Sequence, residues 1–286
     1  MKLESGQVAV VTGAASGIGF ALAEALGARG LTIVLADVEA GPLDAARASL
    51  DARGVAVQAH VCDVADAVAV DALARSVFAG LGKVDVLVNN AGVGGSLGPL
   101  WDSNPGDWAW TFGVNVFGVA HGLRSFLPTM LRRRAGYVVN IASLAGLTAP
   151  PFLGPYVASK HAVVGLSESL AAELAAAGSP IRVSVVCPGH VRSRIIESHR
   201  NRPAAFAALP RTAPDVLARI HASFNQALGE PMAPGELASS VLAGIEQDTF
   251  LILTHPGFND QVRARLASVD RATRQASSPR PDTVNG

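Results

Sequence analysis

The chain has 286 residues, a length that allows one large α/β domain or two domains of ordinary size. Nonpolar residues make up 49% of it and charged residues only 16%, against roughly 25% in an average globular domain, and this composition excludes a disordered chain. The 23 basic and 23 acidic residues cancel without forming a basic stripe, so we expect neither nucleic acid nor an anionic membrane as a partner.

Cysteine and apolar patterns indicate the compartment. Cys62 and Cys187 give no disulfide framework, and the seven histidines show no paired spacing, so we expect no metal site and a reducing cytoplasm. The uncharged stretches at 5–23 and 135–159 are interrupted by glycine, proline or polar residues, whereas a membrane-spanning helix needs about 20 continuous apolar residues. The first apolar run passes into a glycine turn instead of a signal-peptide cleavage pattern.

Short apolar runs alternate with longer helical patterns from end to end. The runs are mostly continuous Val, Ile and Leu, which is typical of parallel strands buried on both faces. They predict strands at residues 8–11, 32–36, 56–61, 84–88, 137–141, 182–186 and 250–253. The longer patterns predict helices at about 17–29, 40–53, 66–80, 105–132, 155–177 and 235–247. This repetition predicts a single α/β domain over 1–286, with a Rossmann-type doubly wound parallel sheet of about seven strands.

Two segments depart from the repetition. Residues 189–234, between the sixth and seventh predicted strands, carry helix-like pieces with scattered Arg, His and Pro. An excursion of this length in a compact repeat predicts a lid over the substrate. Residues 276–286 are polar with two prolines and predict a disordered tail.

The first strand runs into a glycine-rich turn, Thr12-Gly13-Ala14-Ala15-Ser16-Gly17-Ile18-Gly19, followed by a helical pattern. Backbone N–H groups at a helix N-terminus point outward and the helix dipole adds partial positive charge, so the turn favours an anion. Glycine lets the backbone approach a pyrophosphate closely. A purely structural turn is the alternative, but the position after the first strand favours a dinucleotide.

Asp37 ends the second predicted strand, 18 residues past Gly19. A carboxylate there accepts hydrogen bonds from a ribose diol and repels a 2′-phosphate. Neither position 37 nor 38 is arginine, and Ser16 in the turn is not basic. These positions predict NAD as the cofactor in preference to NADP.

Tyr156 and Lys160 are four residues apart at the start of a helical pattern and therefore share a helix face. A free phenol, with a pKa of about 10, is a poor base at neutral pH, and a neighbouring ammonium favours the phenolate. Such a tyrosine can take a hydroxyl proton as hydride leaves, or return it to a carbonyl. Ser143, just past the fifth strand, can orient the substrate oxygen. By spacing alone, a surface packing pair remains the alternative for Tyr156 and Lys160.

Taken in order, the motifs resemble those of the short-chain dehydrogenase/reductase family over about residues 6–255. They are the glycine-rich turn, Asn89-Asn90-Ala91-Gly92 after the fourth strand, Asn115, Ser143, Tyr156-x-x-x-Lys160 and Pro188-Gly189. The resemblance implies a hydride-transferring enzyme whose catalytic residues are Asn115, Ser143, Tyr156 and Lys160. In it, Asn115 would hold a water that relays protons from Lys160 to solvent.

The resemblance also implies which residues would bind the cofactor. The pyrophosphate would lie against Thr12, Gly13, Ser16, Gly17, Ile18 and Gly19. The adenosine would lie against Asp37, Val38, Asp63 and Val64. The ribose side would meet Asn90, Ala91 and Gly92. The nicotinamide half would meet Tyr156, Lys160, Pro188, Gly189, Val191 and Ser193, although the family commonly has threonine at the position of Ser193.

Three features bear on the substrate. An apolar pocket is predicted from Leu144, Gly146, Leu147, Pro151, Phe152 and Leu153. The tryptophans Trp101, Trp108 and Trp110 either add aromatic surface or pack on their own helix. Segments 143–148 and 193–203 and the pair Thr254-His255 resemble bacterial short-chain enzymes that oxidise benzylic secondary alcohols of lignin-type aryl ethers. We therefore expect a bulky, aromatic secondary alcohol or its ketone. The lid arginines and His190 leave a carboxylate-bearing substrate as an alternative to a solvated lid face.

Two rival functions remain open at this point. A 3-oxoacyl or hydroxysteroid dehydrogenase uses the same catalytic residues, although the absence of an NADP-type arginine disfavours a biosynthetic acyl reductase. A non-catalytic nucleotide-binding sensor would usually lack a catalytic side chain, and all four are present here. The family usually forms dimers or tetramers, so we expect a homodimer or homotetramer that buries the helices at 105–132 and 155–177.

Overall fold

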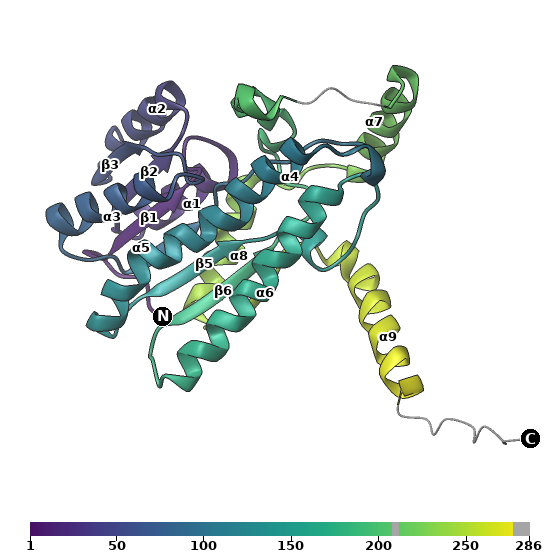
Figure 1. The fold of residues 1–286 in the computed structure, drawn as a ribbon. Coiled ribbons are helices and arrows are strands. Elements are labelled where there is room, and N and C mark those ends of the chain that lie inside the picture. The colour runs from purple at the N-terminus through teal and green to yellow at the C-terminus, as the bar shows by residue number, and fades with distance from the viewer. Residues whose placement is uncertain (208–211, 277–286) are drawn as a thin grey trace, which may run out of the picture.

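The computed structural model describes residues 1–207 and 212–276, in which seven parallel strands form one sheet with helices on both faces (Figure 1). The strands are β1 (Val8–Thr12), β2 (Thr32–Asp37), β3 (Val57–Val61), β4 (Val86–Asn89), β5 (Tyr137–Ile141), β6 (Arg182–Cys187) and β7 (Leu251–Leu253). Their order, β3-β2-β1-β4-β5-β6-β7, confirms the predicted doubly wound sheet. The strand order reverses between β1 and β4, and ligands of such sheets bind beyond the carboxyl ends of the strands at this point.

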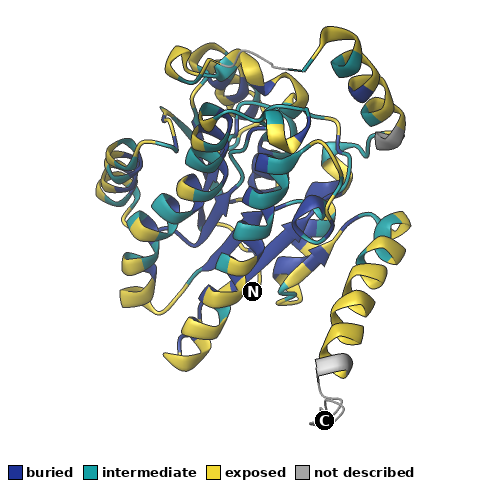
Figure 2. Cartoon of the chain, turned by 45° about the vertical axis from the view of Figure 1, so that its right-hand side comes forward, coloured by how far each residue is buried: buried dark blue, intermediate teal, exposed yellow. Residues whose placement is uncertain are grey.

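The helices divide between two hydrophobic clusters. On one face, α1 (Gly17–Gly27), α2 (Ala40–Asp51) and α8 (Pro234–Glu246) pack on side chains such as Val11. On the other face, α3 (Ala67–Leu81), α5 (Gly118–Arg133) and α6 (Gly154–Ala176) pack on side chains such as Val10. Successive strand side chains point to opposite faces, so a strand covered on both faces is mostly apolar. All five residues of β1 are buried, and Figure 2 shows the middle of the sheet as buried.

The helix predicted at 105–132 is interrupted in the structure. A capping box of Asn104 and Asp107 starts α4 (Pro105–Phe112), one π-helical turn follows at Gly113–Phe117, and α5 continues the helix. Asn115 lies in the π turn. Such turns re-aim side chains and are frequent at functional sites. A single wider turn does not disturb the apolar pattern enough to be read from the sequence.

The segment 189–234 leaves the sheet after β6, and its two ends are hydrogen-bonded to each other. It contains two 3₁₀ segments, η4 (Ile195–Asn201) and η5 (Ala204–Phe206), and the helix α7 (Pro214–Leu228). Its two ends are joined because the Arg192 N–H donates to the Met232 carbonyl, and the Met232 N–H to the His190 carbonyl, both at 3.0 Å. Residues 208–211 lie outside the described residues.

A helix that the sequence analysis did not predict follows the sheet. After a 3₁₀ turn at Pro256–Phe258, α9 (Asn259–Ala276) projects from the body of the protein and is largely exposed (Figures 1 and 2). Its apolar residues, among them Leu266 at 63% exposure, are interspersed with Arg and Asp, which hides the helical period. Of the tail predicted at 276–286, Ala276 ends α9, and residues 277–286 lie outside the described residues. Within the described part of the chain, no helix is long and apolar enough to cross a membrane.

Candidate active site

The glycine-rich turn after β1 is held against the end of β4 by reciprocal hydrogen bonds. Thr12 Oγ1 accepts from the N–H groups of Asn90 and Ala91, at 2.9 and 3.1 Å. The Asn90 side-chain amide donates to the carbonyls of Thr12 and Gly13, at 2.8 and 3.1 Å. The two loops therefore form one unit, in which Asn90 and Ala91 also fix the shape of the turn.

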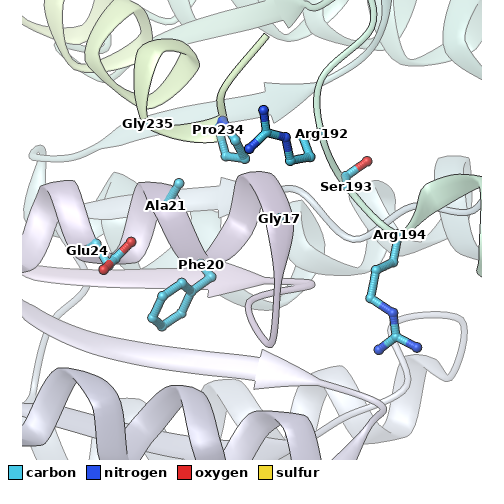
Figure 3. A pocket seen from close by; sticks show the side chains of 9 residues that line it. All are labelled: Gly17, Phe20, Ala21, Glu24, Arg192, Ser193, Arg194, Pro234 and Gly235. Atoms are coloured by element: carbon cyan, nitrogen blue, oxygen red, sulfur yellow. The ribbon is translucent and has the colours of Figure 1, made fainter. Parts of the chain in front are cut away.

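The turn has no room for a side chain at Gly13 or Gly19, and Gly17 faces the 189–234 segment. A Cβ at Gly19 would come within 2.2 Å of the Gly13 carbonyl oxygen, and one at Gly13, whose φ is +63°, within 2.7 Å of Ala91 Cα. A Cβ at Gly17 would lie 3.0 Å from Ser193 Cβ. Figure 3 shows this approach at a hollow of about 450 Å³ beside α1. Ser16 makes no side-chain cap bond, so the first N–H groups of α1 have no partner of that kind and the turn suits an anion.

The Asp37 carboxylate is fixed at the carboxyl end of β2. Its Oδ2 accepts from the Ala15 N–H at 2.9 Å and its Oδ1 from the Glu39 N–H at 3.0 Å. A carboxylate oxygen has two lone pairs, so both oxygens keep acceptor capacity for the hydroxyls of a ribose. The donor set of the turn and this carboxylate together fit an adenine dinucleotide.

The neighbouring residues predicted for adenosine lie at the ends of β2 and β3. Val38 is exposed beside Asp37, and Asp63 Oδ1 accepts from the Ala65 N–H at 2.9 Å. Val64 is buried, and its carbonyl lies 2.9 Å from His121 Nδ1. The side chain of Val64 therefore packs in the core, and its carbonyl is already engaged by α5.

The predicted catalytic side chains come from three elements. Ser143 follows β5, Tyr156 and Lys160 lie in the first turns of α6, and Asn115 lies in the π turn. Lys160 Nζ donates to the Ile141 carbonyl at 3.0 Å and lies 5.7 Å from the centre of the Tyr156 ring. Ser143 Oγ accepts from the Ala145 N–H at 3.1 Å and lies 3.4 Å from the Pro188 carbonyl oxygen.

Asn115 connects the loop after β4 with α6. Its Oδ1 accepts from the Val93 N–H at 2.8 Å, and its amide donates to the Val93 carbonyl at 3.0 Å and to Ser159 Oγ at 2.9 Å. Ser159 Oγ in turn donates to the Tyr156 carbonyl at 2.8 Å. Both amide hydrogens of Asn115 are used, so a water held by this residue would have to donate to an oxygen.

Gly92 lies next to both the side-chain oxygen of Asn115 and the amino group of Lys160. A Cβ at this position would lie 3.4 Å from Asn115 Oδ1 and 3.5 Å from Lys160 Nζ. Both side chains are buried. The carboxamide oxygen and the amino group therefore border one small volume beneath the loop after β4.

Burial has the largest effect on the pKa values of Tyr156 and Lys160. It raises the pKa of the Tyr156 phenol above its ordinary value, while a hydrogen bond with Ser143 acts in the opposite direction. Burial lowers the pKa of Lys160 from 10.5 to about 8, and the Cys187 thiol acts weakly against it. The sequence argument expected Lys160 to favour the phenolate, whereas in the structure burial raises the pKa of the phenol and the opposing contribution comes from Ser143, not from Lys160.

The lowered pKa of Lys160 predicts a pH-dependent stability difference from Lys160→Met in the cofactor-free protein. Unfolded lysine holds its proton to about pH 10.5 and folded Lys160 only to about pH 8, so between these values the unfolded state binds more protons. The free energy of unfolding of the wild type should therefore rise relative to the variant across this interval, by at most about 3 kcal/mol. Urea unfolding of both proteins at several pH values measures this, and a constant difference would contradict it.

His255 is a site residue that the sequence analysis named only as part of a subgroup pattern. Its Nδ1 accepts from the Gly189 N–H at 3.1 Å, and its Nε2 lies 3.0 Å from the His190 carbonyl. A neutral ring with the proton on Nε2 satisfies both contacts. His255, just past β7, thus clamps the turn predicted to lie along the nicotinamide.

The 189–234 segment is attached to the body at several points. Ser198 Oγ accepts from the Gly94 N–H at 2.9 Å. Arg202 pairs with Asp107 at 2.7 Å, and these side chains are only 12% and 4% exposed. The Arg202 guanidinium lies 5.3 Å from the centre of the Trp110 ring. These partners are too far apart in the sequence for any local pattern to reveal them.

The predicted apolar pocket corresponds only in part to a hollow in the structure. A hollow of about 550 Å³ is lined by Pro99, Leu100, Trp101, Trp108, Ala149, Pro150, Pro151, Phe152, Gly154, Val157, Ala158 and His161. Pro151, Phe152, Trp101 and Trp108 are therefore brought together, which for these two tryptophans corresponds to the aromatic-surface alternative. Trp110 is instead buried beneath Arg202, and Gly146 packs against the Lys160 carbonyl. The hollow uses the face of α6 that carries Val157 and His161, not the face of Tyr156 and Lys160.

The two cysteines and the acidic residues within the described ranges give no sign of other chemistry. Burial raises the pKa of Cys62 to about 11 and that of Cys187 to about 12, so both thiols stay protonated at neutral pH. Over residues 1–207 and 212–276, no group of three or more His, Cys, Asp or Glu side chains could hold a metal ion.

Comparison with known proteins gives consistent similarities. Residues 7–204 match the family described as short chain dehydrogenase. The chain is 32% identical over 282 residues to a C alpha-dehydrogenase of Sphingobium sp. strain SYK-6, covering 98% of this chain and 90% of that protein. This similarity confirms the predicted resemblance to the aryl-ether alcohol dehydrogenases.

Solved structures with either nicotinamide cofactor resemble the chain. A short chain dehydrogenase/reductase from Burkholderia phymatum in complex with NAD is 40% identical, with a TM-score of 0.90, over 98% of this chain and 100% of that one. A metagenomic short-chain oxidoreductase in complex with NADP is 34% identical, with a TM-score of 0.68, over 88% of this chain and 97% of that one.

Proposed function

The chain belongs to the short-chain dehydrogenase family and is an oxidoreductase of a nicotinamide cofactor, and from this premise we propose that it uses NAD to interconvert a bulky, aromatic secondary alcohol and its ketone. The observation that carries the proposal is the convergence of Ser143, Tyr156, Lys160 and Asn115 beside a dinucleotide turn bordered by Asp37. A nicotinamide bound beside these residues would supply the hydride acceptor for oxidation and the hydride donor for reduction.

The chain's own residues would handle the proton. Ser143 holds the substrate oxygen, and Tyr156 removes its proton in oxidation or supplies one in reduction. The amino group of Lys160, with a pKa of about 8, can exchange a proton at neutral pH. The oxygen of Asn115 beside Lys160 supports the expected water relay, because it can accept from that water.

Three features of the turn support NAD as the cofactor. Asp37 is held by two backbone N–H groups, in a position to accept from ribose hydroxyls. Ser16 of the turn is uncharged, and the next residue along the chain from Asp37 is the exposed Val38. An adenosine 2′-phosphate would place its charge against the Asp37 carboxylate.

An uncharged substrate is supported by the pairing of three arginines of the 189–234 segment. Arg194 and Arg200 face Glu39, and Arg202 pairs with Asp107. A guanidinium that already faces a carboxylate gains little from a second one, so a carboxylate-bearing substrate is disfavoured. The aryl alcohol is preferred to the 3-oxoacyl and hydroxysteroid alternatives because segments 143–148 and 193–203 resemble enzymes that oxidise benzylic alcohols.

The proposal predicts a substrate preference. With NAD, bulky 1-arylalkan-1-ols should give kcat/KM at least about tenfold above small aliphatic secondary alcohols, because the buried aryl area adds binding energy. Appearance of reduced nicotinamide is followed by absorbance across a panel of both alcohol types, with NADP in a parallel series. Equal turnover of the two types would contradict the aryl assignment, and turnover with acyl or steroid substrates alone would favour the alternatives.

Assembly and compartment remain predictions. The exposed side chains of Phe117 and Leu131, from the π turn and α5, support burial of this helical region in a homodimer or homotetramer. The two buried, unpaired cysteines support a reducing compartment, and the cytoplasm is the expected one.

A further inference from the structure

Two arginines of the 189–234 segment meet an acidic residue beside the predicted adenosine ribose. Arg200 Nε lies 3.0 Å from Glu39 Oε1, and its Nη2 lies 2.5 Å from Oε2, which is a bidentate pair. Arg194 Nη1 lies 3.8 Å from the same Oε1. Figure 3 shows Arg192 extending toward Pro234 and Arg194 extending to the opposite side. The Glu39 and Arg200 side chains are 17% and 24% exposed, so solvent screens their pairing only in part.

The pair is connected to the ribose-binding turn. The Glu39 N–H donates to Asp37 Oδ1 at 3.0 Å, so the two acidic residues belong to one turn after β2. The pKa of Arg200 is raised, mainly by its hydrogen bond to Glu39 and also by the charges of Glu39, Glu197 and Asp37. Arg200 therefore lies within electrostatic reach of the carboxylate that would hold the ribose.

A free guanidinium at this edge would be a binding group for a 2′-phosphate. Here Glu39 occupies the fork of Arg200, and Arg194 lies between Glu39 and Glu197. Together with Asp37, the carboxylates of Glu39 and Glu197 outnumber the guanidinium groups of Arg194 and Arg200 by three to two. The part of the site that would face the adenosine ribose therefore carries excess negative charge. We propose that Glu39 is a specificity-determining residue that, by engaging Arg200, keeps the adenosine edge selective for NAD over NADP.

A purely structural role for the pair makes a different prediction. Arg200 Nη1 also donates to the carbonyls of Arg194 and Glu197, at 3.1 and 3.0 Å, so the pair helps to fasten η4. If the pair only held η4 in place, loss of Glu39 would weaken the binding of NADH and of NADPH by the same factor. The ratio of the NADPH and NADH dissociation constants, and not either constant alone, therefore distinguishes a role in selectivity from a purely structural role.

The test is a fluorescence titration of NADH and NADPH without substrate. In Glu39→Gln, we expect the ratio of the NADPH and NADH dissociation constants to fall at least about tenfold, because Arg200 becomes available to the phosphate. Glu39→Gln/Arg200→Gln should lose this gain, and Glu39→Asp, which keeps the charge, should retain the wild-type ratio. Thermal unfolding checks that each variant is folded.

Glu246→Gln is the matched control, since Glu246 pairs with Arg29 beyond the far end of α1, and its ratio should not change. An equal shift of both constants in Glu39→Gln, or an NADPH gain that persists in the double variant, overturns the proposal. The inference rests on the proposed function, but the titration separates the two failures. Wild type that prefers NADPH refutes the NAD assignment, whereas wild type that prefers NADH with an unchanged ratio in Glu39→Gln refutes only the role of Glu39.

Discussion

Replacing Tyr156 by phenylalanine is expected to lower kcat by about 10³-fold while leaving NADH binding unchanged. The substitution removes one oxygen, the group to which the proposed site assigns proton transfer with the substrate oxygen, and positioned acid–base groups typically contribute about 10² to 10⁴ in rate. Steady-state assays give kcat, and fluorescence titration gives the NADH dissociation constant.

The chain supplies a matched control for this variant. Its other tyrosine, Tyr137, is buried at the start of β5, whereas Ser143 follows the end of that strand, and it contacts Ser184 Oγ at 2.8 Å. Tyr137→Phe should cost about 1 kcal/mol of stability through the lost hydrogen bond and leave kcat nearly unchanged. If Tyr156→Phe turned over like Tyr137→Phe, the proposed role of Tyr156 would be wrong.

Gly19→Ala is expected to weaken NADH binding by about a hundredfold and to cost about 2 kcal/mol of stability. The new Cβ would come within 2.2 Å of the Gly13 carbonyl and 2.5 Å of Asn90 Nδ2, neither of which can move without disturbing the turn. Overpacking of this kind costs about 1–3 kcal/mol, and displaced N–H donors lose charge-assisted bonds to a phosphate. Titration and urea unfolding measure the two effects.

Gly165→Ala tests whether the effect is specific to the turn. Gly165 lies in α6, and a Cβ there meets nothing within 4 Å. Alanine favours a helix over glycine by about 1 kcal/mol, so this variant should be slightly more stable and bind NADH normally. Normal NADH binding by Gly19→Ala would show that the turn does not hold the cofactor.

The sheet was predictable because its signals are local. The continuous apolar runs marked all seven strands, and the structure shifts their ends by two residues or fewer. The glycine turn, Asp37 and the Tyr156–Lys160 spacing could be read directly, since each depends on short stretches of chain. The π turn at Asn115 and the polar helix α9 were missed because neither changes the apolar period clearly.

The contacts that surround the site were not predictable from local pattern. Glu39 and Arg200 are separated by 161 residues, and Gly189 and His255 by 66. The sequence argument for NAD considered basic residues only at positions 16, 37 and 38, whereas folding brings Arg200 to the same edge from the 189–234 segment. Likewise, Trp110 and Trp108 are two residues apart, yet one lies under Arg202 and the other lines the open hollow.

The most direct test of the account is the transfer of deuterium. The enzyme is incubated with NAD and a 1-arylethanol that carries deuterium on its carbinol carbon, and the reduced cofactor is analysed by mass spectrometry. The account predicts NADH that is one mass unit heavier than the product from unlabelled alcohol, with none formed by Tyr156→Phe over the same time. Reduced cofactor without the label, or label transferred only to NADP, would contradict it.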